Sequence, residues 1–90
     1  MTPGMPPKIV MYSGDHCGDC RRSKRLLDSL GVAYEVIEVD GNLQALEKVM
    51  EINNGIRSIP VIVFEDGTHL TEPSDNALKT KLKELSIIRD

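Results

Sequence analysis

The stretch DHCGDCRR, residues 15–22, contains both cysteines of the chain, Cys17 and Cys20. It follows the apolar run IVMY (residues 9–12), which predicts a buried strand, and it opens a segment with helical periodicity. A helix N-terminus carries unpaired N–H groups and a partial positive charge, which stabilise a thiolate at Cys17. The sulfur of Cys20, one helical turn further on, can reach that of Cys17. The pattern predicts a thiol–disulfide redox site.

Composition limits the class of protein and its partners. The chain has 90 residues, 40% hydrophobic and 28% charged, which suits one globular domain, expected over residues 8–90. The formal net charge of −3 argues against nucleic acid or an anionic membrane as a partner, and favours a monomer. No apolar run approaches the roughly 20 residues that span a bilayer.

The first seven residues, MTPGMPP, have neither a basic region nor an apolar core, so they predict a flexible tail rather than a signal peptide. The expected compartment is therefore the reducing cytoplasm. In that compartment, a pair of cysteines at this spacing indicates catalysis rather than a structural disulfide.

Hydrophobic periodicity predicts the element order β-α-β-α-β-β-α. Strands are expected at 8–13, 32–39, 61–64 and around 69–70, and helices from residues 17, 43 and 75. Asp66-Gly67 predicts a hairpin turn, and Ser74 or Asp75 an N-cap. Positions expected to face the core include Tyr34, Val36, Leu43, Val49, Ala77, Leu78 and Leu82. A parallel β-α-β unit followed by a hairpin gives an α/β fold with one mixed four-stranded sheet and helices on its faces.

Over residues 8–86 the chain resembles glutaredoxins, most closely the mycoredoxins and glutaredoxin-like small redoxins. The resemblance rests on the Cys17-Gly18-Asp19-Cys20 motif, the RSIPV segment at 57–61, the DG hairpin turn, and the LTEPSD segment at 70–75. It implies the thioredoxin-like fold of the glutaredoxin type and a thiol–disulfide oxidoreductase. It also implies that Cys17 is the nucleophile and Cys20 the resolving cysteine.

The same resemblance implies a site for the thiol substrate. By position, Pro60 matches the family's cis proline, which leaves the backbone of Ile59 free to pair with an extended thiol-bearing substrate. Arg57 matches a position that faces the carboxylate of the thiol. The turn at Ser74 and Asp75 would bind its polar end through helix N-terminal N–H groups.

Several positions depart from the pattern of glutathione-dependent members, among them Gly18-Asp19, Ser58-Ile59 and Glu72-Pro73. Glutathione-dependent members usually carry Gly-Gly where this chain has Glu72-Pro73, and mycoredoxin-like members carry Asn-Pro there. Glu72-Pro73 would narrow the groove and add charge to it. The expected co-substrate is a low-molecular-weight thiol, glutathione or mycothiol, and no tightly bound cofactor is expected.

Charged residues in the first turn of the helix are expected to modulate the thiol. Asp19 disfavours a nearby thiolate and would make the site less acidic and more reducing, whereas Arg21 would lower the thiol pKa. No metal is expected, because zinc needs four N or S ligands while His16 and His69 lie on different elements. The expected environment of His16 is simple exposure to solvent.

The leading hypothesis is an enzyme that reduces protein disulfides, or mixed disulfides of proteins with a small thiol. Its electrons would come from the thiol pool or from a flavin disulfide reductase. One alternative is a redoxin reduced by thioredoxin reductase. Another is a dimeric module that binds an iron–sulfur cluster through Cys17, as Gly18 suggests; Cys20 argues against it, because an internal disulfide competes with cluster ligation.

Overall fold

The computed structural model describes residues 9–89, so the predicted tail at residues 1–7 lies outside the described part. The elements follow the predicted order β-α-β-α-β-β-α. They are β1 (Val10–Ser13), α1 (Gly18–Ser29), β2 (Glu35–Glu38), α2 (Leu43–Ile52), β3 (Val61–Val63), β4 (His69–Thr71) and α3 (Asp75–Glu84). The second strand is shorter than predicted, because Val32 donates its N–H to the carbonyl of Leu27 (3.0 Å) and so belongs to the end of α1.

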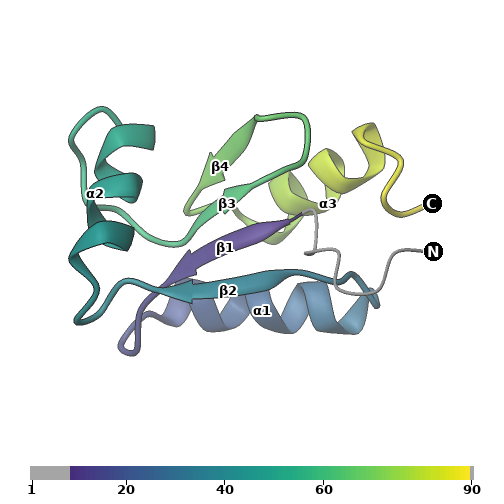
Figure 1. Cartoon of the computed structure of the whole chain (residues 1–90). Coiled ribbons are helices and arrows are strands. Elements are labelled where there is room, and N and C mark those ends of the chain that lie inside the picture. Colours follow the sequence, from purple (N-terminus) through teal and green to yellow (C-terminus); the bar gives the residue numbers. More distant parts are fainter. Residues whose placement is uncertain (1–8, 90) are drawn as a thin grey trace, which may run out of the picture.

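The sheet is mixed and has four strands in the order β2-β1-β3-β4 (Figure 1). Strand β1 pairs in parallel with β2 and antiparallel with β3, which in turn pairs antiparallel with β4. Helices α1 and α3 cover one face, and α2 covers the other. This is the thioredoxin-like α/β fold that the sequence predicts, with β1 in the interior of the sheet and leading into α1.

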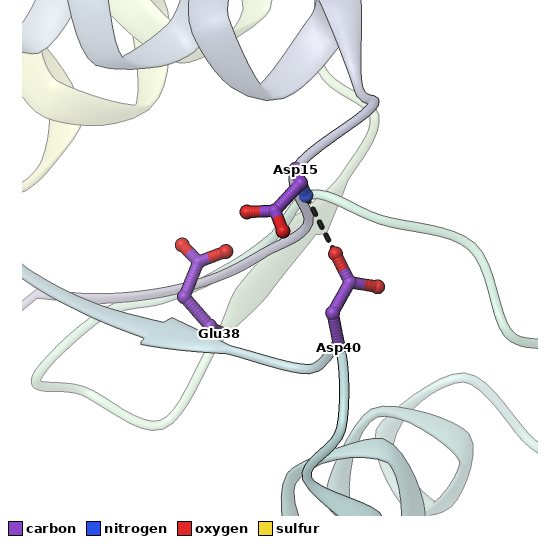
Figure 2. Close-up of side chains that lie close together, drawn as sticks. All are labelled: Asp15, Glu38 and Asp40. Carbon is purple, nitrogen blue, oxygen red and sulfur yellow. Dashed lines mark hydrogen bonds between the residues drawn. The ribbon is translucent and has the colours of Figure 1, made fainter.

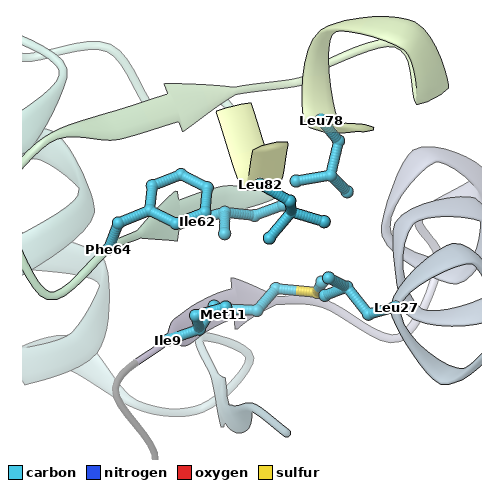
Figure 3. Close-up of a cluster of buried hydrophobic side chains, with 7 residues drawn as sticks. All are labelled: Ile9, Met11, Leu27, Ile62, Phe64, Leu78 and Leu82. Carbon is cyan, nitrogen blue, oxygen red and sulfur yellow. The ribbon is translucent and has the colours of Figure 1, made fainter. Parts of the chain in front are cut away.

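Each face of the sheet has its own hydrophobic cluster, because successive strand residues point to opposite faces. Met11 and its cross-strand partner Ile62 point toward α1 and α3, whereas Tyr12 and its partner Val61 point toward α2. Figure 3 shows the first cluster, in which side chains of β1 and β3 meet those of the two helices. Its members are Ile9, Met11, Leu27, Ile62, Phe64, Leu78 and Leu82.

Three predicted core positions are exposed, so those predictions were wrong. Val36 is 37% exposed because β2 is an edge strand. Leu43 is 77% exposed because it is the first residue of α2, before the helix reaches the sheet; the buried positions of that helix are Ala45 and Val49. Ala77, in the first turn of α3, is also exposed. Periodicity identifies the apolar side of a helix but not the residue at which the contact with the sheet begins.

Candidate active site

Cys17 is the N-cap of α1, and its sulfur acts as the capping atom. Its backbone is extended (φ −132°, ψ 104°), and Cys20 donates its backbone N–H to the Cys17 Sγ over 3.1 Å. An N-cap acceptor normally satisfies one of the unpaired N–H groups of the first turn. Here the acceptor is a sulfur, so the same N–H and the positive end of the helix dipole favour its thiolate form.

The two cysteines form a disulfide, with their Cα atoms 5.2 Å apart. Their environments differ: Cys17 is partly exposed, whereas Cys20 is fully buried. A disulfide is attacked at the sulfur that a thiol can reach. The accessible sulfur is that of Cys17.

The loop before β3 lies against this sulfur. The Ile59–Pro60 peptide bond is cis, as predicted, and the carbonyl oxygen of Ile59 lies 3.9 Å from the Cys17 Sγ. Pro60 is buried, and its carbonyl accepts a hydrogen bond of 2.9 Å from the N–H of Glu72. The structure therefore brings Cys17, Ile59 and Pro60 together at one end of the sheet.

Gly14 fits between the Cys17 turn and this loop, a contact that the sequence reasoning missed. A Cβ atom at Gly14 would lie 2.7 Å from the Ile59 Cδ1 and 3.4 Å from an oxygen of Asp40. The absence of a side chain thus allows the turn to approach the loop that carries the cis proline. A glycine in a strand-to-helix turn was the available signal, although it does not say which segment comes close.

A cluster of three acidic residues lies where the turn before Cys17 meets the end of β2 (Figure 2). The Asp40 Oδ2 accepts the N–H of Asp15 at 2.7 Å, which fixes the backbone two residues before Cys17. Carboxylate oxygens of Asp15, Glu38 and Asp40 all lie within 4.8 Å of one another, and all three residues are exposed. Glu38 is also 3.8 Å from the Nζ of Lys24. Of these three carboxylates, that of Asp40 holds the turn, and that of Glu38 pairs with α1.

On the other side of the cysteines, Arg22 connects α1 to the start of α3. Its guanidinium lies 3.1 Å from Asp19 and 3.7 Å from Asp75, and it donates to the carbonyl of Pro73 at 3.4 Å. The contact between Arg22 and α3 was not predicted from the sequence. The Asp19–Arg22 spacing of i, i+3 indicated half of this arrangement, whereas the contact with α3 depends on the fold.

The other residues predicted to modulate the site lie on the surface. The guanidinium of Arg21 donates to the backbone carbonyl of Asp15 at 3.3 Å and so also supports the turn. His16 is exposed, as predicted. Asp19 is partly exposed and paired with Arg22.

The residues predicted to bind the thiol lie on two segments. Of the two predicted caps, Ser74 is the N-cap of α3, and its Oγ accepts the N–H of Ala77 at 3.1 Å, while Asp75 is the first residue of that helix. Arg57 is exposed in the loop between α2 and β3. Within residues 9–89, no hydrogen bond or ion pair joins Arg57 to Ser74 or Asp75.

Glu72 adopts a backbone conformation that the sequence did not reveal. Its φ is +49°, in the left-handed region that favours glycine. The resemblance places a Gly-Gly pair of other glutaredoxins at this position and the next. Glu72 therefore takes a backbone conformation that glycine adopts more readily, and its side chain adds a carboxylate to the turn.

The glutaredoxin family model matches residues 9–70, more than half of the chain. This chain belongs to the glutaredoxin family. It is 35% identical over 78 residues to mycoredoxin 1 of Corynebacterium glutamicum, a match that covers 87% of this chain and 96% of the relative. This glutaredoxin is accordingly a thiol–disulfide oxidoreductase.

Solved structures of a glutaredoxin and a glutaredoxin-like protein superimpose on this chain. The glutaredoxin of Archaeoglobus fulgidus superimposes with a TM-score of 0.73 at 32% identity, covering 86% of each chain. NrdH-redoxin of Escherichia coli, a glutaredoxin-like protein described as having a thioredoxin-like activity profile, gives a TM-score of 0.69 at 25% identity, covering 80% of this chain and 91% of that one. No helix within residues 9–89 is long and apolar enough to cross a membrane.

Proposed function

We propose that this glutaredoxin reduces mixed disulfides between proteins and a low-molecular-weight thiol, as well as protein disulfides, with Cys17 as nucleophile and Cys20 as resolving cysteine. The observation that carries this assignment is the difference between the two sulfurs. Cys17 is partly exposed and sits at the helix N-terminus, whereas Cys20 is buried behind it. An attacking thiolate must be reachable, and the N-terminal N–H groups lower its pKa.

The reaction proceeds by exchange of one disulfide for another. The Cys17 thiolate attacks the small thiol's sulfur in the mixed disulfide; a bond forms between the two sulfurs, and the protein substrate leaves as its thiolate. A second small thiol then releases Cys17 as a free thiolate and carries the oxidised equivalent away as its own disulfide. Alternatively, the Cys20 thiolate attacks Cys17, which releases the small thiol and leaves the internal disulfide for reduction by two further thiols or by a flavin disulfide reductase.

The surroundings favour an uncharged thiol as co-substrate. Ile59 and Pro60 would hold its extended chain, and Arg57 with the Ser74–Asp75 turn would contact its polar end. However, Arg22 is already paired with two carboxylates, and Glu72 adds another exposed one beside the cis proline. The guanidinium of Arg57 would attract an anion, but the carboxylates of Glu72 and of the two residues paired with Arg22 oppose it. Glutathione is an anion at neutral pH, whereas mycothiol carries no carboxylate, so of the two expected thiols mycothiol suits this balance of charges better.

We further propose that the protein is a monomer that works in the cytoplasm. The cytoplasm suits two reactive cysteines, because a reducing compartment keeps them available for catalysis. The net charge of −3 favours protein and small-thiol partners over nucleic acid or a membrane surface.

A second candidate function is that of a redoxin reduced directly by thioredoxin reductase. It is supported by the likeness to NrdH-redoxin, and by a Cys17–Cys20 disulfide that such a reductase could open. The two candidates differ in the role of Cys20. A small thiol can recycle the enzyme through Cys17 alone, whereas the reductase requires the internal disulfide.

The experiment is a turnover assay on hydroxyethyl disulfide with wild type and Cys20→Ser. It is run in parallel with glutathione, with mycothiol, and with thioredoxin reductase plus NADPH. Activity with mycothiol that survives Cys20→Ser is the expected result and identifies the co-substrate. Activity with the reductase alone, abolished by Cys20→Ser, would contradict the proposal and establish the second candidate.

A further inference from the structure

Asn53, at the C-terminal end of α2, has a side chain that reaches both segments flanking the cis proline. Its backbone is fixed to the helix by a 2.9 Å hydrogen bond from its N–H to the carbonyl of Val49. Its side-chain Nδ2 donates to the carbonyl of Ser58 at 3.1 Å, and its Oδ1 accepts the hydroxyl of Thr71 at 2.7 Å. One partly buried amide group therefore holds the loop before β3 and the end of β4 at the same time.

Both segments continue directly into the active site. Ser58 precedes Ile59, whose carbonyl oxygen faces the accessible sulfur of the disulfide at 3.9 Å. Thr71 precedes Glu72, whose N–H donates to the carbonyl of Pro60. The two partners of the amide group are thus each one residue away from a group that forms the wall of the site.

The hydrogen bond from Asn53 to Ser58 follows an exposed segment, residues 54–57. Residues 54–57 are all exposed, and Asn54 and Gly55 both have positive φ, 56° and 93°. Two N–H groups of this stretch still bond to the end of α2, that of Gly55 to the carbonyl of Met50 (2.6 Å) and that of Ile56 to the carbonyl of Asn53 (3.3 Å). The side-chain hydrogen bond from Asn53 extends this attachment to Ser58, the residue before Ile59.

We propose that Asn53 is a positioning residue for disulfide exchange with peptide substrates. It acts through Ser58 and Thr71 to hold the Ile59 backbone where an extended, cysteine-bearing peptide pairs with it beside Cys17. The inference rests on the proposed function. Backbone hydrogen bonds weaken steeply with misalignment, so a displaced Ile59 lowers the affinity for a peptide. Hydroxyethyl disulfide has no backbone to pair and is indifferent to that displacement.

The test is a single-turnover reaction of the fully reduced protein with two disulfides. One is a peptide whose cysteine is joined to a chromophoric aromatic thiol; attack of Cys17 on the peptide sulfur forms the new disulfide and releases the coloured thiolate. The other is hydroxyethyl disulfide. Asn53→Ala is expected to raise the half-saturating peptide concentration about tenfold, while the rate constant with hydroxyethyl disulfide stays within about twofold of wild type.

Two further variants separate the partners of the amide. Asn53→Asp keeps an acceptor for Thr71 but turns a carboxylate oxygen toward the Ser58 carbonyl, so it is expected to match Asn53→Ala. Thr71→Val removes only the hydrogen bond to β4, and a two- to threefold rise in the half-saturating concentration is expected. These variants also decide the question if Asn53→Ala does not fold.

The matched control is Asn42→Ala, at the other end of the same helix. The Asn42 Oδ1 caps α2 by accepting the N–H of Ala45 at 3.1 Å, and within residues 9–89 no hydrogen bond joins its side chain to the loop before β3. Its loss costs stability but should leave the half-saturating peptide concentration unchanged. A rise in Asn42→Ala equal to that in Asn53→Ala, or equal losses with both disulfides in the Asn53 variants, would overturn the proposal.

Failure of the proposed function would look different from failure of this inference. In that case wild type would still react in single turnover, but no low-molecular-weight thiol would return it to the reduced state. The comparison between Asn53 and Asn42 variants needs no recycling. It therefore decides the role of Asn53 in either case.

Discussion

The N-termini of α1 and α3 are built in the same way from different atoms. In α1 the Cys17 Sγ accepts the N–H of Cys20 at 3.1 Å, and in α3 the Ser74 Oγ accepts the N–H of Ala77, also at 3.1 Å. Both capping residues have extended backbones. The two helices therefore begin with the same capping hydrogen bond. They differ in the capping atom, which is a sulfur in α1 and a hydroxyl oxygen in α3.

An ordinary helix N-cap position is therefore enough to place a reactive thiol in this fold. A hydroxyl at an N-cap stays protonated and only satisfies the backbone. A free thiol has a pKa of about 8.5, so a modest shift by the same N–H and helix dipole brings it to neutrality and favours the reactive anion. The second difference is the residue three positions on: Cys20 follows Cys17, while Ala77 follows Ser74. Only α1 can close a disulfide.

The largest effect is expected from Cys17→Ser, which gives α1 the cap of α3. Serine is a good N-cap, so the free energy of unfolding of the reduced protein should stay within about 1 kcal/mol of wild type. Turnover of hydroxyethyl disulfide should fall at least about a thousandfold, because no sulfur remains to attack. Steady-state assays and urea titrations measure the two quantities. Residual turnover within tenfold of wild type would assign the nucleophile to Cys20.

The converse change, Ser74→Cys, tests whether the cap geometry is sufficient. In a background with Cys17→Ser and Cys20→Ser, the new thiol has the N-terminus of α3 but no resolving partner. Its pKa is expected to fall about one unit below that of a free cysteine, measured by the pH dependence of iodoacetamide alkylation. A pKa at or above about 8.5 would show that capping alone does not activate a thiol.

A smaller shift is expected from Asp19→Asn, which removes a carboxylate from the first turn of α1. Asp19 is paired with Arg22 at 3.1 Å, so part of its field is already neutralised. The pKa of the Cys17 thiol should fall by less than about one unit, because the negative charge that opposes the thiolate is lost. Alkylation rates across pH measure it. An unchanged or raised pKa would contradict the assignment of Asp19 as a residue that makes the site less acidic.

The smallest effect on the site is expected from Tyr34, at the opposite end of α1. Burial, together with its hydrogen bond to Asp28, raises the pKa of Tyr34 to about 12. The neutral phenol is the form favoured in the folded protein, so its contribution to stability is complete below about pH 10 and is lost as pH rises toward about 12. Spectrophotometric titration should show this ionisation, and Tyr34→Phe should remove it while leaving Cys17 alkylation unchanged. A change in Cys17 reactivity would show that the two ends of α1 are coupled.

The sequence was sufficient for features that depend on residues close together in the chain. The position of Cys17 and Cys20 at a helix start, the cap at Ser74 and the order of elements all follow from local patterns. The resemblance to the family added the cis bond at Pro60.

Contacts between distant segments could not be predicted, because they depend on how the helices pack on the sheet. Arg22 meets the carbonyl of Pro73 across 51 positions of sequence, and Asn53 meets Thr71 across 18. The close approach of Gly14 to Ile59 is of the same kind. These long-range contacts fix the Cys17 turn, the cis-proline loop and the start of α3 relative to one another.

Cys17, as the cap of α1, is proposed to be an activated nucleophile. The most direct measurement is the rate of iodoacetamide alkylation of the reduced protein across pH, with mass spectrometry to identify the modified residue, on wild type and Cys20→Ser. In wild type we expect Cys17 to be alkylated before Cys20, and in both proteins we expect its pKa to lie below the value of about 8.5 for a free cysteine. Alkylation of Cys20 first, or a Cys17 pKa at or above about 8.5, would contradict it.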